Sequence, residues 1–178
     1  MQMKPKDPLL ATVQVLLVLI KIVFIFGIVM LGIGAGALLS VGRADVLAKI
    51  AEVGAPDGAY WLLLAIIVFT MGILALGFHF FKELGGVIDS VGEGDPFRAD
   101  NATRLSRMGW ISVAAQAAGL LIGAVVLWLK PYIEKADGHA DLGFGIDAGG
   151  LLLTLILFIL ARVFRRGAEM REELEGTV

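Results

Sequence analysis

The sequence predicts an all-α protein, an integral membrane four-helix bundle with helices extending into the cytoplasm. Apolar residues make up 58% of the 178 residues and charged residues only 18%, too few to cover the surface of a soluble domain. The charges are gathered in short blocks, and the segments between these blocks are almost uncharged. Four of those segments are long enough to cross a bilayer, which takes roughly 20 apolar residues.

The four predicted spans cover residues 22–41, 59–81, 108–129 and 148–164, within a single membrane domain of residues 1–178. Lys21 precedes the first span, and Tyr60 and Trp61 open the second. Trp110 and Trp128 lie near the two ends of the third. Because aromatic rings are at home where the bilayer meets water, these positions support the assignment of the span ends.

Basic residues orient the predicted spans, because cytoplasmic segments carry an excess of Lys and Arg. The N-terminus, the loop 82–107 and the segment from Arg162 onward hold ten of them: Lys4, Lys6, Lys82, Arg98, Arg104, Arg107, Arg162, Arg165, Arg166 and Arg171. The opposite side holds four: Arg43, Lys49, Lys130 and Lys135. This asymmetry predicts that both termini, the loop 82–107 and the tail 165–178 are cytoplasmic.

Helical periodicity continues beyond three of the spans. After the second span, apolar residues recur at helical spacing at Leu84, Val87, Ile88 and Val91. Residues 92–96 break this pattern with Gly and Pro, and Asp100 or Asn101 is expected to cap the helix that leads into the third span. The fourth helix is expected to continue to Leu174. The outward loops are short and rich in Gly, Asp and Ala.

Residues 9–20 form a shorter apolar stretch before Lys21. They fit two interpretations. One is an interfacial segment lying along the inner leaflet. The other is the beginning of one long first helix, in which the Lys21 side chain reaches the headgroups.

Few residues in the sequence are of the types that bind metals or cofactors or that catalyse reactions. The chain has no cysteine, and its two histidines, His79 and His139, fall on opposite sides of the predicted membrane. We therefore expect no cofactor, no metal and no enzyme activity. Gln116 is expected to make an interhelical hydrogen bond, and Asp147 to reach the outer headgroups. A net charge of −2 argues against direct nucleic-acid binding.

Glycines spaced four residues apart occur in the first and third spans, at Gly32 and Gly36 and at Gly119 and Gly123. Small residues at this spacing let helix backbones approach closely in lipid. They fit packing inside one bundle better than a dimer face, which leaves a homo-oligomer as an open alternative.

Two segments carry a family resemblance. GDPFRADNATRLSRMGW (94–110) resembles the pattern G-x-P-F-x-x-x-N-x-x-R-L-x-x-x-G-W, and FRRGAEMREELEGTV (164–178) resembles F-x-x-G-x-x-L-x-E-E-x-x-x-T-V. Both patterns are features of the small bacterial membrane proteins grouped as domain of unknown function 2975. Met170 stands where Leu is usual, and Gly176 where an aliphatic residue is more common. The similarity in layout covers nearly the whole chain.

The resemblance implies a multi-pass protein of the bacterial cytoplasmic (inner) membrane, often encoded beside a small helix-turn-helix regulator of the Cro/C1 type. No catalytic residues come with the family. We therefore expect a non-enzymatic protein of the lipid bilayer that binds a cytoplasmic partner, with a small DNA-binding transcriptional regulator as the first choice. The candidate partner-binding residues are Phe97, Asn101, Arg104, Leu105, Phe164, Arg165, Gly167, Glu172, Glu173 and Val178.

Two other functions are open to the sequence. A small oligomeric transporter or channel, the main alternative, predicts polar groups that converge in mid-membrane. An enzyme acting on lipid predicts carboxylates or histidines clustered at one interface. The family-like residues instead fall on or just inside the predicted cytoplasmic face, which favours partner binding.

Overall fold

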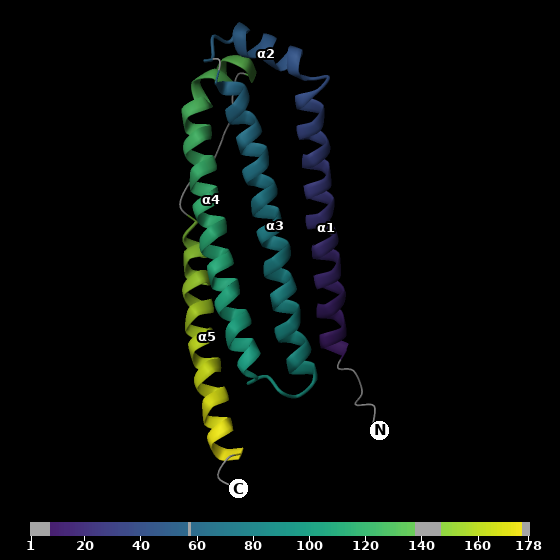
Figure 1. Cartoon of the computed structure of the whole chain (residues 1–178), viewed down its shortest axis with the longest axis vertical. Coiled ribbons are helices and arrows are strands. Elements are labelled where there is room, and N and C mark those ends of the chain that lie inside the picture. Colours follow the sequence, from purple (N-terminus) through teal and green to yellow (C-terminus); the bar gives the residue numbers. More distant parts are fainter. Residues whose placement is uncertain (1–7, 57, 138–146, 176–178) are drawn as a thin grey trace. The chain divides into compact units, whose positions relative to one another are not determined.

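The computed structural model describes residues 8–56, 58–137 and 147–175, and every regular element in these ranges is a helix. The helices are α1 (Pro8–Leu39), α2 (Arg43–Glu52), α3 (Ala59–Gly92), α4 (Ala99–Asp137) and α5 (Ala148–Glu175) (Figure 1). All but the short α2 are long and apolar enough to cross a membrane. The predicted all-α class and the four spanning helices are confirmed, and the chain is a multi-pass membrane protein.

The helices are longer than the spans predicted from hydropathy. Residues 9–20 lie in α1 and are continuous with the first span, as expected for one long first helix. This helix ends at Leu39, two residues before the predicted Val41, where the Gly42 N–H donates to the Ala37 carbonyl at 2.9 Å. The helices also continue beyond the second and fourth spans, as predicted: α3 runs to Gly92 and α5 to Glu175.

Helix α2 lies in the segment after the first span, where a loop was expected. Its apolar residues Val46, Leu47 and Ile50 are spaced to share one face of a short helix. At 10 residues α2 is too short to cross a bilayer. The signal was present in the sequence, but a short amphipathic run between Gly42 and Gly54 resembles a polar loop in composition.

The chain divides into two compact units. Unit 1 comprises Met1–Phe24, Leu76–Ala114 and Ala148–Val178, and unit 2 comprises Ile25–Ala75 and Ala115–Asp147. Helices α1, α3 and α4 each run through both units, whereas α2 belongs to unit 2 and α5 to unit 1.

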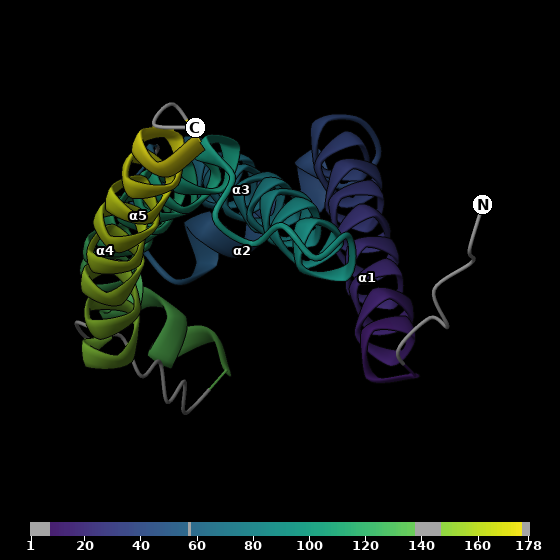
Figure 2. The same cartoon turned by 90° about the horizontal axis from the view of Figure 1, so that it is seen from below.

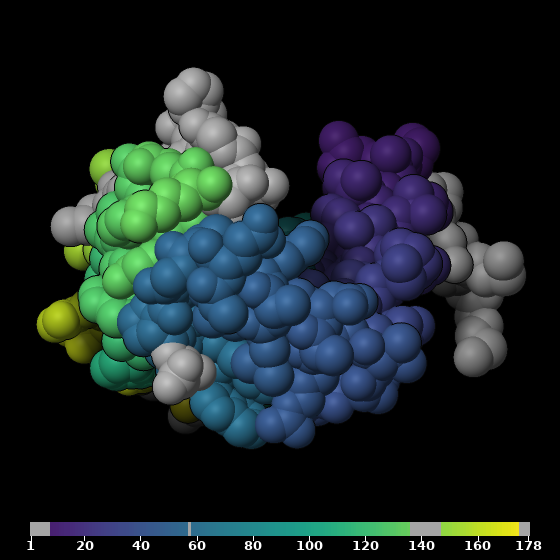
Figure 3. All heavy atoms as spheres, turned by 90° about the horizontal axis from the view of Figure 1, so that it is seen from above, coloured from purple at the N-terminus to yellow at the C-terminus, as the bar shows by residue number. Residues whose placement is uncertain are grey.

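In unit 2, the second part of α1 packs against the first part of α3. A methyl group added at Gly27 would lie 3.1 Å from Cδ1 of Leu74, so the absence of a side chain lets the two helices approach. The buried Tyr60 hydroxyl donates to the Leu38 carbonyl at 2.9 Å, which ties the end of α1 to the start of α3. Figure 3 shows α2 and the beginning of α3 as neighbouring blue surfaces of this unit.

In unit 1, neighbouring helices make contacts in the order α1, α3, α4, α5, and Figure 2 shows these helices nearly end-on. The rings of Phe24 and Phe81 lie 5.7 Å apart, and Gln14 Nε2 donates to Asp89 Oδ1 at 2.9 Å. Both contacts join α1 to α3. A core of buried side chains joins α4 to α5: Leu105 and Met108 of α4 with Leu157 and Ala161 of α5. Phe80 and Leu84 of α3 and Phe164 of α5 pack against this core.

Many apolar side chains of the long helices face outward. On α1 alone, Val23, Phe26 and Ile33 are each more than 60% exposed. A soluble protein would bury a helix that is apolar all round, whereas a membrane protein can leave it facing lipid. The exposed apolar surface is therefore the side of the fold that contacts the acyl chains.

Candidate functional site

The connection between α3 and α4 is held by Asn101, whose role differs from the predicted one. A helix N-cap is the residue directly before the first helical residue. Helix α4 begins at Ala99, so Asp100 and Asn101 both lie within its first turn and neither occupies the cap position. The Asn101 side chain, 1% exposed, donates to Ser90 Oγ at 2.5 Å and to the Pro96 carbonyl at 2.8 Å. The predicted helix cap is wrong: Asn101 joins the end of α3, the loop and the start of α4.

Two arginines on consecutive turns of α4 share one carboxylate of α3. Arg104 Nη1 lies 3.3 Å from Glu83 Oε2, and Arg107 Nη1 lies 3.4 Å from Glu83 Oε1. The Arg104 guanidinium also lies against the backbone of Gly86, where an added methyl carbon would fall 2.0 Å from Nη1. Since any side chain at position 86 would displace this guanidinium, Arg104 and Gly86 together hold α3 close to α4.

The loop before α4 packs against α5. The ring of Phe97 lies 5.3 Å from that of Phe164, and a methyl carbon added at Gly167 would come within 2.7 Å of Phe97 Cδ1. Next to it, Arg171 of α5 forms an ion pair with Asp95 of the loop. The loop is therefore fixed by α5 from one side and by Asn101 from the other.

A pocket of about 280 Å³ lies at this junction, and we call it the Phe97 pocket. Residues of the loop, of α4 and of α5 line it, among them Phe97, Arg98, Asp100, Ala168, Arg171 and Glu172. Although its ring rests on α5, Phe97 is still 46% exposed, so the pocket offers an apolar surface to a ligand.

The charges around the Phe97 pocket do not balance. Arg98 pairs with Glu93 at 2.7 Å, and Arg171 pairs with Asp95. Asp100 and Glu172 have no ion pair within the part of the chain that the structure describes. The two arginines and two carboxylates that line the pocket balance one another, and their ion-pair partners Glu93 and Asp95 add two negative charges beside it, so this group of six residues has a net charge of 2 − 4 = −2. The arrangement therefore suits a ligand that carries a positive charge beside an apolar group.

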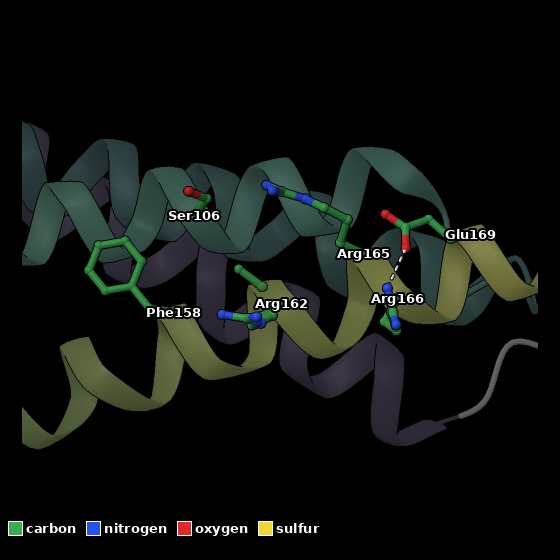
Figure 4. A pocket seen from close by; sticks show the side chains of 7 residues that line it. Ser106, Phe158, Arg162, Arg165, Arg166 and Glu169 are labelled. Atoms are coloured by element: carbon green, nitrogen blue, oxygen red, sulfur yellow. Dashed lines mark ion pairs between the residues drawn. The ribbon is translucent and has the colours of Figure 1, made fainter.

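A second pocket, of about 380 Å³, lies between α4 and the middle of α5 and is shown in Figure 4. We call it the arginine pocket, because Arg162, Arg165 and Arg166 line it together with Ser106, Phe158 and Glu169. It belongs to unit 1, like the Phe97 pocket.

The structure separates the predicted partner-binding residues into groups. Leu105 belongs to the core and Phe164 packs against it, whereas Asn101, Arg104 and Gly167 hold neighbouring segments together. Phe97 and Glu172 line the Phe97 pocket, whereas Arg165 lines the arginine pocket.

Two candidates remain, Glu173 and Val178. Glu173 lies on α5 with an exposed side chain. Val178 falls outside the described residues.

Sequence reasoning missed several residues of the Phe97 pocket. The sequence suggests only a capping role for Asp100, and the pairing of Arg171 with Asp95 joins positions 76 residues apart. No periodicity or local motif signals such a pairing.

The described ranges contain no group of three His, Asp or Glu side chains placed to hold a metal ion.

Comparison with known proteins gives one match. A family model described as a protein of unknown function, DUF2975, matches residues 46–178, a range that includes both pockets. No curated protein and no solved structure matches this chain. The matching family and the helical fold give no sign of catalysis.

Proposed function

This chain belongs to the DUF2975 family of proteins of unknown function, and we propose that it is a non-enzymatic membrane protein that binds a cytoplasmic protein at the Phe97 pocket. The observation that carries the proposal is the pocket itself. An exposed aromatic ring of the loop lies beside two carboxylates, Asp100 of α4 and Glu172 of α5, that form no ion pair among the described residues, and hydrogen bonds and ring packing hold the loop in place.

The side of the membrane follows from the distribution of basic residues. The loop 82–107 and α5 after Arg162 lie on the side that holds ten Lys and Arg, against four on the other. By the positive-inside rule, the Phe97 pocket and both chain termini then face the cytoplasm. In a bacterial cell the membrane concerned is the cytoplasmic membrane. A pocket on this side is open to soluble cytoplasmic proteins.

The chemistry of the pocket points to a basic partner. Its lining together with the adjacent Glu93 and Asp95 has a net charge of −2, which attracts positively charged groups and repels nucleic acid. Phe97 supplies an aromatic contact of the kind that contributes most to protein–protein affinity. A small helix-turn-helix regulator fits both features, because proteins of this kind carry basic residues for DNA phosphates. Bound here, the regulator would be held at the membrane.

Site-specific photo-crosslinking in cells tests this proposal. A photoreactive phenylalanine analogue in place of Arg98, whose side chain is 44% exposed at the pocket rim, should crosslink to a cytoplasmic protein. The matched control places the analogue at the exposed Lys49 of α2, on the other predicted side of the membrane, and should not give that product. Mass spectrometry of the crosslinked species identifies the partner.

Two results would contradict the proposal. One is the same crosslinked product from Arg98 and Lys49. The other is no protein product from Arg98, Asp100 or Glu172 when the variant protein is present in the membrane at the native level.

A further inference from the structure

We propose that the arginine pocket binds the phosphate group of an anionic phospholipid from the leaflet that surrounds this end of unit 1. The inference is independent of the proposed function, because the pocket does not share its lining with the Phe97 pocket. The inference also holds whichever side of the membrane the arginine pocket faces.

The pocket collects positive charge on one face of α5. Arg162, Arg165, Arg166 and Glu169 follow one another at intervals of three, one and three residues, so their side chains project from consecutive turns on one face. Figure 4 shows them with Ser106 of α4 at the pocket. Three arginines against one glutamate give a net charge of 3 − 1 = +2.

That charge is largely uncompensated. Arg166 Nη1 lies 3.6 Å from Glu169 Oε2, in a pair whose side chains are 80% and 51% exposed. Arg162 and Arg165 form no ion pair with any residue that the structure describes. A phosphate oxygen could accept from both guanidinium groups, and the Ser106 hydroxyl, which also lines the pocket, offers a further donor.

The floor of the pocket continues into the lipid-facing surface. Phe158 lines the pocket, and Leu151 and Leu155 precede it on the same face of α5, with 52% and 58% of their surface exposed. On α4, Trp110 is 65% exposed and contacts the Phe158 ring edge-on at 5.6 Å between centroids. Tryptophan is enriched where headgroups meet acyl chains.

An amphipathic ligand matches the apolar surface of α5 and the arginines that follow it. An acyl chain would lie along Leu151, Leu155 and Phe158, and the phosphate would follow at Arg162 and Arg165. A free phosphate ion would use only the arginines, so the apolar surface distinguishes the two ligands and favours the lipid. Basic pockets between membrane helices are recurrent sites for anionic lipid headgroups.

Lipid binding by the purified full-length protein in detergent provides the test, with fluorescent phosphatidylglycerol as the probe and phosphatidylcholine as the neutral comparison. We expect tighter binding of phosphatidylglycerol. Because each arginine near a membrane surface strengthens binding of an anionic lipid by roughly fivefold, replacing Arg162 and Arg165 by Gln should weaken it by roughly 25-fold. Inorganic phosphate at millimolar concentration should compete poorly.

Two further variants make the result specific. The pair Lys49→Gln and Lys130→Gln removes the same charge outside the pocket and should leave binding of phosphatidylglycerol within twofold of native. The pair Arg162→Lys and Arg165→Lys keeps the charge that orients the helix but lacks the planar fork, and should give an intermediate affinity.

Three outcomes would overturn the proposal. The first is native affinity in the Arg162→Gln, Arg165→Gln variant. The second is equal loss of affinity in the Lys49→Gln, Lys130→Gln control. The third is displacement of phosphatidylglycerol by inorganic phosphate at equal concentration, which would make a free anion the ligand.

Discussion

Replacing Asp100 and Glu172 by lysine should weaken binding of the proposed cytoplasmic partner more than a hundredfold. These carboxylates at the Phe97 pocket have no ion pair among the described residues, so their charge is available to a partner. The double substitution changes the net charge of the lining together with Glu93 and Asp95 from −2 to +2. Opposing like charges cost a complex several kcal/mol, and about 3 kcal/mol corresponds to more than a hundredfold in Kd. Co-purification of the partner with tagged protein from native membranes measures the loss.

The control for this variant is Asp45→Lys with Glu52→Lys in α2. It makes the same change in net charge on side chains that are exposed and remote in sequence from the pocket. Partner recovery should stay at the native level. Since Asp100 lies in the first turn of α4, where a negative charge is favourable by about 0.3–1 kcal/mol, membrane levels of both variants must be compared first. Full recovery of the partner by the Asp100→Lys, Glu172→Lys protein would contradict the proposed function.

The largest effect on stability is expected from Gly109→Leu. Gly109 of α4 is buried against the ring of Phe158 of α5, and a methyl carbon added there would lie 2.9–3.1 Å from three ring carbons. Leucine carries three further carbons and would force the helices apart. Overpacking of this kind costs about 1–3 kcal/mol or more. In lipid, close packing is a main source of helix association, so the midpoint of thermal unfolding in detergent should fall by several degrees.

Gly119→Leu on the same helix is the matched control. Among the described residues, nothing lies within 4 Å of a methyl carbon at Gly119, so leucine begins in open space there and should leave the midpoint near the native value. A second variant checks the cause. Adding Phe158→Ala to Gly109→Leu opens room for the new side chain and should restore part of the loss. Equal midpoints for Gly109→Leu and Gly119→Leu would show that the α4–α5 contact contributes little.

Hydropathy and charge were sufficient to predict the four spanning helices, and two short segments were sufficient to identify the family. Both predictions rest on local properties: the length of an apolar run, or the identity of residues at fixed spacing. The continuation of α3 past Phe81 was predictable for the same reason, because a helical period persists in the sequence to Val91.

The contacts of the site were not predictable in this way. A helix that is apolar all round gives no periodic signal of which face meets a neighbour, since lipid-facing and buried positions share one composition. Phe97 and Gly167 are 70 positions apart in the chain, and only the structure shows that the ring covers the glycine. Likewise Asn101 has the residue type of a helix cap, but the loop brings Ser90 and Pro96 within reach of its amide. Tertiary geometry outweighed the local preference.

Thiol labelling in intact cells tests most directly the claim that the Phe97 pocket faces the cytoplasm. The chain has no cysteine, so Arg98→Cys and Lys49→Cys each introduce a single reactive group at an exposed position. With a maleimide that does not cross the cytoplasmic membrane, Lys49→Cys should be labelled in intact cells. Arg98→Cys should be labelled only after that membrane is permeabilised. Labelling of Arg98→Cys in intact cells, with Lys49→Cys protected, would contradict a Phe97 pocket that faces the cytoplasm.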